Sequence, residues 1–240
     1  ASHNPGQYNG LKICREHAIP VGGDSGLQEI EQLAAAATAA PREQRGSVRG
    51  ADVRDDYVRH ALSVGGRCPE LRVVIDCGNG MASVGLERLL PALPLEVERL
   101  YFEPDGTFPN HEADPLKREN LEDLINAVKR SGAQLGVAFD GDGDRAMFVD
   151  DQGEPITADL ITGLLAASQL RRHGGRGLIL YDLRSSRATA EAIAEAGGTP
   201  EMCRVGHAFI KAQMRESGAV FAGELSGHFY FRFSPTLVHD

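Results

Sequence analysis

Cysteine is scarce in this chain of 240 residues, which holds four cysteines and no CxxC pair. The spacing of the four fits neither a zinc site nor a dense disulfide framework. We therefore expect reduced, mostly buried thiols and a cytoplasmic location. The residues concerned are Cys14, Cys68, Cys77 and Cys203.

Long apolar runs and dense basic blocks are missing as well. No run of 18 apolar residues occurs, so we expect no membrane span. The formal net charge is −9, the sequence pI is near 5.4, and Lys and Arg form no cluster, which argues against a nucleic-acid partner. Such an acidic protein would need local cations or a metal to hold an anionic substrate.

What is present is typical of a globular protein, with 42% hydrophobic and 25% charged residues. The first block, residues 1–46, predicts a loop, a strand at 11–15 and an Ala-rich helix at 27–40, before a polar linker at 44–50. A motif begins at residue 1 with no strand before it, and the last residues run on from another motif. We therefore expect part of a longer chain.

Two further blocks, residues 51–153 and from 156 on, alternate helices and strands. This alternation indicates α/β units with largely parallel sheets. The two units share their order of elements, although no motif repeats. We expect helices at 52–64, 83–93, 118–131, 158–171, 186–196 and 208–217, and strands at 71–77, 95–101, 134–139, 146–149, 177–181, 199–204 and 219–222.

The strongest single feature is the sequence DGDGDR at residues 140–145, directly after an apolar strand. Alternate residues of a tight loop can turn their side chains toward one point, and glycine lets the backbone fold there. Three clustered carboxylates repel one another unless a cation lies among them, and hard oxygen ligands suit Mg²⁺. Asp140, Asp142 and Asp144 are therefore candidate ligands of Mg²⁺.

Three other interpretations of this loop compete. An EF-hand also begins D-x-D-x-D, but here Arg145 occupies position six in place of Gly, and Asp151 occupies position twelve in place of Glu. The predicted flanks are strands, not helices. A phosphatase with an aspartate nucleophile and a solvated acidic turn are the other two.

Two weaker loops carry hydroxyl, imidazole and carboxyl groups. Ser2 and His3 lie in a Gly/Pro/Asn-rich loop near Lys12, so Ser2 could serve as a nucleophile or phosphate carrier. The sequence GELSGH at residues 223–228 could bind sugar hydroxyls, because each unmatched buried polar group costs about 1–3 kcal/mol. Taken alone, the Ser2 loop is better explained by ordinary turn and cap residues, and Glu224 could simply cap a turn.

Cationic residues follow two of the predicted strands. The sequence DLRSSR at 182–187 contains Arg184 and Arg187, and RVGH at 204–207 ends in His207. Cations at the carboxyl ends of strands in α/β sheets are well placed for phosphate. A charged first turn of a surface helix is the alternative.

Together the loops are far more specific than any one of them. ASHNP at residues 1–5, then 140–145, then 223–228 occur in the order and at about the spacing seen in α-D-phosphohexomutases, and VIDCGNG at 74–80 and DGTFPNH at 105–111 fit the same pattern. The chain resembles this family over nearly all of its length. Within it, the chain is similar to the bacterial phosphomannomutase/phosphoglucomutase branch.

The resemblance implies successive mixed-sheet α/β domains of the phosphohexomutase type around a central cleft. Residues 1–48 would be the C-terminal part of domain 1 with a phosphoserine loop. Residues 49–154 would be domain 2 with the metal loop, and 155–240 a truncated domain 3 with the sugar loop. Domain 4 would be absent.

The implied activity is an isomerase reaction that interconverts hexose 1-phosphate and hexose 6-phosphate, with mannose or glucose as the sugar. Ser2 would be the phosphoserine, and hexose 1,6-bisphosphate the intermediate and activator. The partner would be a phosphosugar, and neither a nucleic acid nor a membrane. The resemblance does not distinguish a monomer from a homo-oligomer.

The resemblance also implies roles for individual residues. Mg²⁺ would be held by Asp140, Asp142, Asp144 and the phosphate on Ser2. His3, Lys12 and Arg145 would lie beside the reacting groups, with Lys12 as the general acid or base. Substrate binding is implied for Arg184, where related bacterial enzymes often have Lys, and for Arg187, His207, Glu224, Ser226 and His228.

Two alternatives stay open at this point. Phosphoglucosamine mutases usually carry Gln at the position of Leu225 and Asp at that of Tyr8, so the sequence favours the other branch. The chain could also be an inactive fragment that keeps a metal site.

Overall fold

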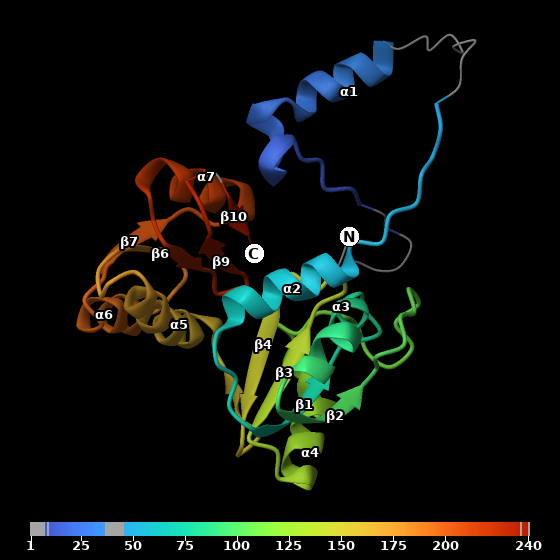
Figure 1. The fold of residues 1–240 in the computed structure, drawn as a ribbon, viewed down its shortest axis with the longest axis vertical. Coiled ribbons are helices and arrows are strands. Elements are labelled where there is room, and N and C mark those ends of the chain that lie inside the picture. Colours follow the sequence, from blue (N-terminus) through green and yellow to red (C-terminus); the bar gives the residue numbers. More distant parts are fainter. Residues whose placement is uncertain (1–7, 9, 37–45, 236, 240) are drawn as a thin grey trace.

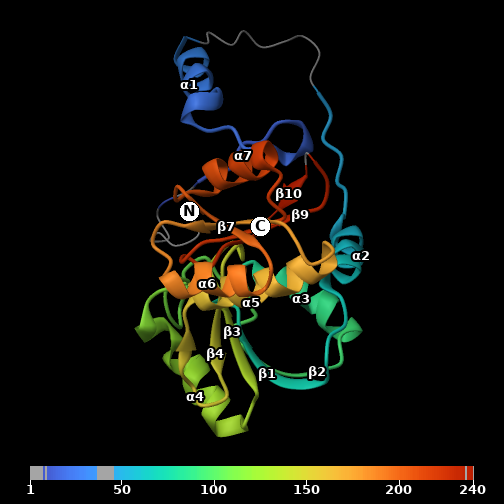
Figure 2. The same cartoon turned by 90° about the vertical axis from the view of Figure 1, so that its left-hand side faces the viewer.

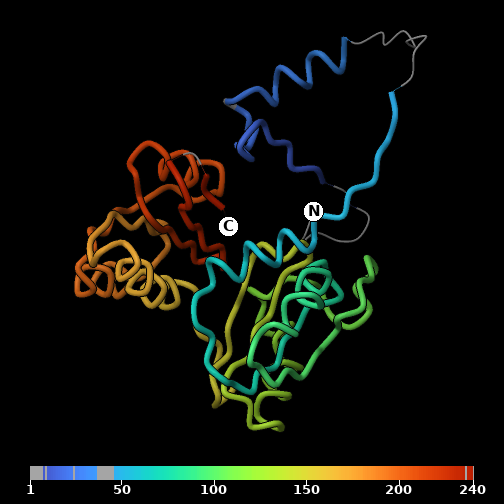
Figure 3. The backbone as a smooth tube through the Cα atoms, in the orientation of Figure 1, coloured from blue at the N-terminus to red at the C-terminus, as the bar shows by residue number. Residues whose placement is uncertain are grey.

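Two α/β units make up most of the chain in this computed structural model, which describes residues 8, 10–36, 46–235 and 237–239. The units lie next to each other, while helix α1 (Leu27–Ala36) projects beyond both of them (Figures 1 and 2). The backbone trace follows the chain from this N-terminal segment into the first unit and then into the second (Figure 3).

The first unit is a five-stranded mixed sheet with helices on both faces. Its strands have the order β2-β1-β3-β4-β5; β1 pairs in parallel with β2 and β3, whereas β4 and β5 are antiparallel. The elements are α2 (Arg54–Gly65), β1 (Leu71–Asp76), α3 (Ala82–Leu89), η3 (Leu90–Ala92), β2 (Leu95–Leu100), η4 (Arg118–Leu121), α4 (Glu122–Ser131), β3 (Leu135–Phe139), β4 (Ala146–Asp150) and β5 (Pro155–Ile156).

Strand β1 is apolar on both faces because both of its faces are covered. Successive side chains of a strand point to opposite faces. Val73 and Ile75 therefore join the core on the side of α3, and Val74 joins the core formed with α4. Helix α4 approaches β3 closely at Gly136, where a Cβ atom would lie 2.9 Å from a methyl group of Val128. The sheet is thereby fixed in the middle of the unit, and the loops at its edge carry the polar residues.

The second unit has the same topology. Its strand order is β10-β9-β8-β6-β7, with β6 parallel to β7 and β8, and with β9 and β10 antiparallel. The elements are α5 (Ala158–Arg172), β6 (Leu178–Asp182), α6 (Arg187–Glu195), β7 (Thr199–Cys203), α7 (His207–Ser217), β8 (Phe221–Gly223), β9 (Phe229–Arg232) and β10 (Val238–His239). The shared order of elements noted in the sequence is thus a shared topology.

This repetition gives each loop of one unit an equivalent in the other. Strands β1 and β6 are each the first strand of a unit, and each ends in an aspartate. The connection from the third to the fourth strand holds residues 140–145 in the first unit and residues 224–228 in the second. The acidic loop and the sugar-binding loop predicted from the sequence therefore occupy equivalent places.

Several sequence expectations need correction. The strand predicted at 11–15 is not formed; the segment makes one isolated bridge, from Cys14 to Pro20, and Leu11 is 93% exposed, so no sheet edge pairs with it. Two short helical turns follow instead, η1 (Glu16–Ala18) and η2 (Gly23–Ser25). The helix predicted at 27–40 begins as expected, and residues 37–40 lie outside the described part of the chain.

The other differences are smaller. The sheets are mixed, which confirms what the resemblance implied and corrects the largely parallel sheets that the alternation indicated, because β4 and β9 pair antiparallel with β3 and β8. The short strands β5, β9 and β10 were not foreseen. All four cysteines are free, but only Cys77 and Cys203 are buried, whereas Cys14 is exposed and Cys68 is partly so. Among the described residues, no helix is both long and apolar enough to span a membrane.

Candidate active site

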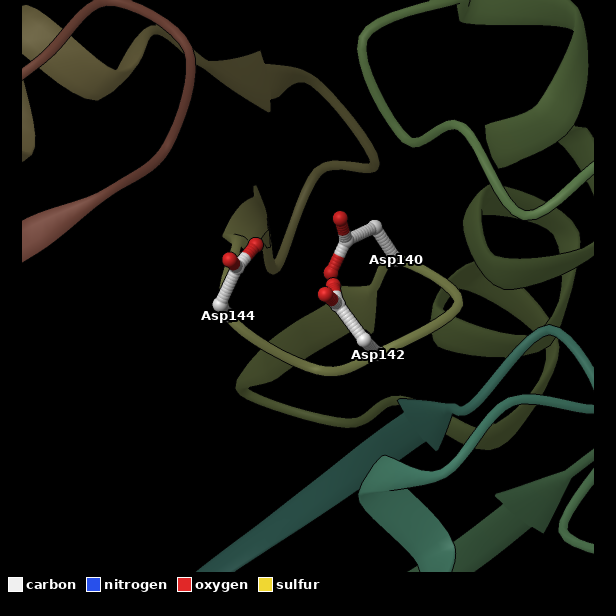
Figure 4. Close-up of side chains that lie close together, drawn as sticks. All are labelled: Asp140, Asp142 and Asp144. Carbon is white, nitrogen blue, oxygen red and sulfur yellow. The ribbon is translucent and has the colours of Figure 1, made fainter. Parts of the chain in front are cut away.

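The acidic loop gathers three carboxylates at one point. It leaves the sheet at the end of β3, and one oxygen from each of Asp140, Asp142 and Asp144 lies within 4.8 Å of the others (Figure 4). Asp140 is fully buried, and its Oδ1 accepts hydrogen bonds from the backbone N–H groups of Gly143 and Arg145 at 3.1 and 3.2 Å. Its Oδ2 has no hydrogen-bond partner among the described residues. A buried carboxylate oxygen without a partner calls for a cation.

The electrostatics of the loop agree with that requirement. Burial and the neighbouring charges of Asp144 and Asp142 raise the pKa of Asp140 to about 6. Burial also acts to raise the pKa of Asp144, but hydrogen bonds from His228 and Lys12 outweigh it and hold this pKa below its usual value. The loop thus carries more negative charge than its own residues neutralise.

Lys12 supplies a cation from a distant part of the sequence. Its Nζ donates to Asp142 Oδ2 at 2.9 Å and forms a second, shorter contact with Asp144. Burial would lower the pKa of Lys12, but these two hydrogen bonds raise it well above its ordinary value. Lys12 is therefore held charged at the mouth of the acidic loop.

The donor set fits a hard divalent cation. Three carboxylates on a glycine-containing loop, one with a buried oxygen that lacks a partner, are the ligands that Mg²⁺ prefers. An EF-hand fits less well, because the loop joins two strands, β3 and β4, and not two helices.

The second loop presents a network of buried polar groups. Glu224 Oε1 accepts from the backbone N–H of Gly206 at 3.1 Å, and Glu224 Oε2 accepts from the hydroxyl of Tyr230 at 2.5 Å. Ser226 Oγ and His228 Nδ1 are 2.9 Å apart. Fixed carboxylate, hydroxyl and imidazole groups of this kind can recognise the hydroxyl groups of a sugar.

The two loops meet directly. His228 Nε2 lies 3.2 Å from Asp144 Oδ1, and the backbone N–H of Ala146 donates to the carbonyl of Gly227 at 3.0 Å. Gly227 has φ +87°, a conformation that glycine adopts without strain. A group bound by the second loop would therefore lie next to the acidic loop.

Two arginines lie within the same region. Arg145 Nε is 3.7 Å from Asp140 Oδ2, and its side chain is largely buried. Arg184 Nη2 donates to Asp182 Oδ2 at 2.6 Å and lies 3.6 Å from Glu224 Oε1. Cations in such positions can stabilise the charge of a phosphate.

Of the remaining predicted residues, one lies near Lys12, one is exposed on its own helix, and two lie outside the described part of the chain. His207 begins α7 and lines a cavity of about 310 Å³ together with Lys12. Arg187 has a side chain that is 95% exposed and pairs with Glu191 of its own helix, so its contact with a substrate stays a prediction. Ser2 and His3 lie outside the described residues.

Comparison with known proteins assigns the family. Models of the phosphoglucomutase/phosphomannomutase α/β/α domains I, II and III match residues 1–41, 55–153 and 157–238 in turn. The chain belongs to the phosphoglucomutase/phosphomannomutase family. The resemblance inferred from the loops is thereby confirmed.

Individual relatives of this family support the assignment. The chain is 43% identical over 234 residues to a protein described as phosphohexose mutases from Xanthomonas campestris, covering 97% of this chain and 52% of the relative. It is 43% identical over 242 residues to a phosphomannomutase from Salmonella typhimurium, and the match covers 97% of this chain and 53% of the relative. The crystal structure of a phosphoglucomutase/phosphomannomutase family protein from Burkholderia thailandensis matches with a TM-score of 0.86 and 40% sequence identity. The match covers 96% of this chain and 49% of that protein. The chain spans about half the length of the curated relatives that it matches.

Some residues of this family member were not singled out from the sequence. Tyr230, which holds Glu224, lies in a strand that was not predicted. Asp182 was noted only as part of a charged cluster, yet it is fully buried and contacts the second loop through the N–H of Leu225 at 2.9 Å. An aspartate at the end of an apolar strand is the signal that could have drawn attention to it.

The hydrogen bond between partly buried His111 and buried Asp76 predicts a pH-dependent stability. His111 Nε2 lies 3.0 Å from Asp76 Oδ2, and its Nδ1 lies 2.8 Å from the carbonyl of Glu112. The hydrogen bond with Asp76 raises the pKa of His111 above 6.5, although burial opposes the shift. A raised folded-state pKa stabilises the fold most fully below the unfolded pKa, and this contribution is lost as the pH rises through the folded value.

We therefore expect His111→Gln to lower the free energy of unfolding by about 2 kcal/mol at pH 6, with a smaller deficit at alkaline pH. Urea unfolding across a pH series measures the loss of unfolding free energy at pH 6 and at alkaline pH. The exposed His173→Gln is the matched control. A deficit that grows with pH would contradict the assignment of a charged His111.

Proposed function

We propose that this chain forms the phosphoryl-transfer centre of a phosphohexomutase, which interconverts hexose 1-phosphate and hexose 6-phosphate of mannose or glucose. The observation that carries the proposal is the direct contact of the acidic loop with the polar loop through Asp144 and His228. The names of the relatives, phosphomannomutase and phosphohexose mutases, support the same activity. They favour it over a phosphoglucosamine mutase. In this proposal domain 1 ends at residue 48, domain 2 covers residues 49–154 and domain 3 begins at residue 155.

In this proposal Asp140, Asp142 and Asp144 hold Mg²⁺ together with the phosphate on Ser2. The metal would supply positive charge that stabilises the phosphate oxygens during transfer. Lys12 adds a further charge at the same point, because its ammonium group already contacts Asp142 and Asp144. The acidic chain thereby gains the local cations that an anionic substrate requires.

Each transfer is a balanced exchange. A hydroxyl oxygen of the sugar forms a bond to phosphorus while the bond from phosphorus to Ser2 Oγ breaks, and the hydroxyl proton ends on Ser2 Oγ. Lys12, held charged, is placed to give its proton to the departing serine oxygen, as a general acid does, and the proton of the sugar hydroxyl then replaces it on Lys12. In total, one proton passes from the hydroxyl to Ser2 Oγ. The reverse transfer from the other end of the bisphosphate restores the phosphoserine.

The sugar must be read in two orientations, because C1 and C6 present their oxygens to the same serine. Glu224, Ser226 and His228 are buried and fixed by hydrogen bonds, so they can bind hydroxyl groups common to both orientations. Arg184, next to Glu224, can neutralise the phosphate that is not transferred. His207 and Arg187 are further candidates for contacts with that phosphate.

Phosphorus NMR of the whole protein that carries this chain tests the proposal. With Mg²⁺ and a trace of the matching 1,6-bisphosphate, we expect mannose 1-phosphate and glucose 1-phosphate to convert to the 6-phosphates, and EDTA to stop the conversion. Faster conversion of glucosamine 1-phosphate would favour a phosphoglucosamine mutase. Release of inorganic phosphate would indicate a phosphatase, and the absence of any conversion would indicate an inactive metal-binding protein.

A further inference from the structure

The repeated topology places one buried aspartate at the same point in each unit. Asp76 is the last residue of β1, Asp182 is the last residue of β6, and their exposed fractions are 1% and 0%. In both, Oδ1 accepts the backbone N–H two residues further on, from Gly78 at 2.7 Å and from Arg184 at 2.8 Å. Each aspartate thus closes a turn at the end of the first strand of its unit, and its other oxygen, Oδ2, is left for a second partner.

In the second unit this oxygen holds the substrate side of the site. Asp182 Oδ2 accepts from the guanidinium of Arg184 at 2.6 and 3.1 Å and from the backbone N–H of Leu225 at 2.9 Å. Leu225 lies between Glu224 and Ser226. One carboxylate thus fixes both the arginine and the loop that presents the candidate sugar ligands.

In the first unit the turn closed by Asp76 Oδ1 supports the acidic loop. Asp76 Oδ2 bonds to His111, and the turn that Asp76 closes leads into Gly80 and Met81. The N–H of Met81 donates to the carbonyl of Gly141 at 2.9 Å, and a Cβ on Gly80 would lie 2.8 Å from that same oxygen. The acidic loop therefore rests directly on the turn that Asp76 orders.

We propose that Asp76 and Asp182 are equivalent positioning residues, the first for metal binding by the acidic loop and the second for sugar phosphate binding by the 224–228 loop. Neither touches the reacting groups. Each fixes the backbone of one half of the site, and a misplaced backbone lowers affinity for the ligand of that half alone. This inference rests on the proposed function, which gives the two loops their ligands.

The test is a crossed pair of substitutions in the whole protein, Asp76→Ala and Asp182→Ala. Titration calorimetry measures the dissociation constants of Mg²⁺ and of glucose 6-phosphate, and the coupled mutase assay gives KM and kcat. We expect Asp76→Ala to weaken Mg²⁺ binding by about tenfold or more with sugar phosphate binding unchanged. Asp182→Ala should weaken sugar phosphate binding and raise KM by about tenfold or more, with the Mg²⁺ constant unchanged.

The two variants control for each other, because each removes a buried carboxylate from the end of a first strand. Circular dichroism shows whether each alanine variant folds. If one does not, both are replaced in the comparison by Asp76→Asn and Asp182→Asn, which keep the side-chain volume. Equal changes in both constants for both variants, or no change in either, would overturn the inference while an active wild type leaves the proposed function standing. A wild type that binds neither ligand would overturn both.

Discussion

Replacing Ser2 by alanine is expected to lower mutase turnover by roughly 10³-fold or more. In the proposed reaction Ser2 is the only covalent carrier of the phosphate, so no other group can hold it between the two transfers. Mg²⁺ affinity should fall much less, because three of the proposed ligands are the carboxylates of the acidic loop. A coupled assay with glucose 1-phosphate measures the turnover, and peptide mass mapping shows whether phosphate has left residue 2.

A matched control for this substitution is Ser63→Ala. Ser63 is an exposed serine of α2 whose hydroxyl donates to the carbonyl of His60 in its own helix. Its replacement should leave turnover and phosphate content unchanged. If Ser2→Ala turns over like the wild type, another residue carries the phosphate and the role of Ser2 is wrong.

The elements of both units were largely predictable because their physical signals are local. The helices near residues 122–131 and 207–217 carry regular apolar faces, and β1 and β6 each contain three or more consecutive apolar residues before a final aspartate. The short strands β9 and β10 were missed because four and two residues are too few to establish a periodic pattern. The segment at 11–15 alternates like a strand, yet no neighbouring strand pairs with it beyond one bridge.

The acidic loop was predictable for the same reason, since its three aspartates stand within five residues of sequence. The contacts of Lys12 with Asp142 and of His228 with Asp144 were not, because they join segments that are distant in the chain. Only the folded arrangement of the N-terminal segment and the two units brings these charges together. The contact of Asp182 with the second loop was hidden likewise, since Leu225 donates this hydrogen bond through its backbone.

The repeated topology explains why such different chemistry can share one site. Each unit delivers the connection between its third and fourth strands to the same region, with acidic residues in one and polar residues in the other. The hydrogen bond from Ala146 to Gly227 joins these two connections at their bases. A metal and a sugar held by separate units would thereby lie side by side, as phosphoryl transfer requires.

The second large effect concerns the metal. Asp142→Asn is expected to weaken Mg²⁺ binding at least about tenfold and to lower turnover in parallel at a fixed Mg²⁺ concentration. Asp142 is the most exposed of the three carboxylates, so its removal disturbs the fold least, and Lys12 keeps its contact with Asp144. The rise in melting temperature on addition of Mg²⁺ should shrink as well, because the shift follows the ratio of metal concentration to dissociation constant.

Asp151→Asn separates this site from the EF-hand alternative. Asp151 is an exposed aspartate in the turn after β4 and stands at position twelve of the EF-hand pattern. Its replacement should leave the Mg²⁺ titration and the melting shift unchanged. An EF-hand would use Asp140, Asp142 and Asp144 as well, so weaker metal binding in both Asp151→Asn and Asp142→Asn would indicate an EF-hand. If Asp142→Asn leaves metal binding unchanged, Asp142 is not a ligand and the assignment of the acidic loop is wrong.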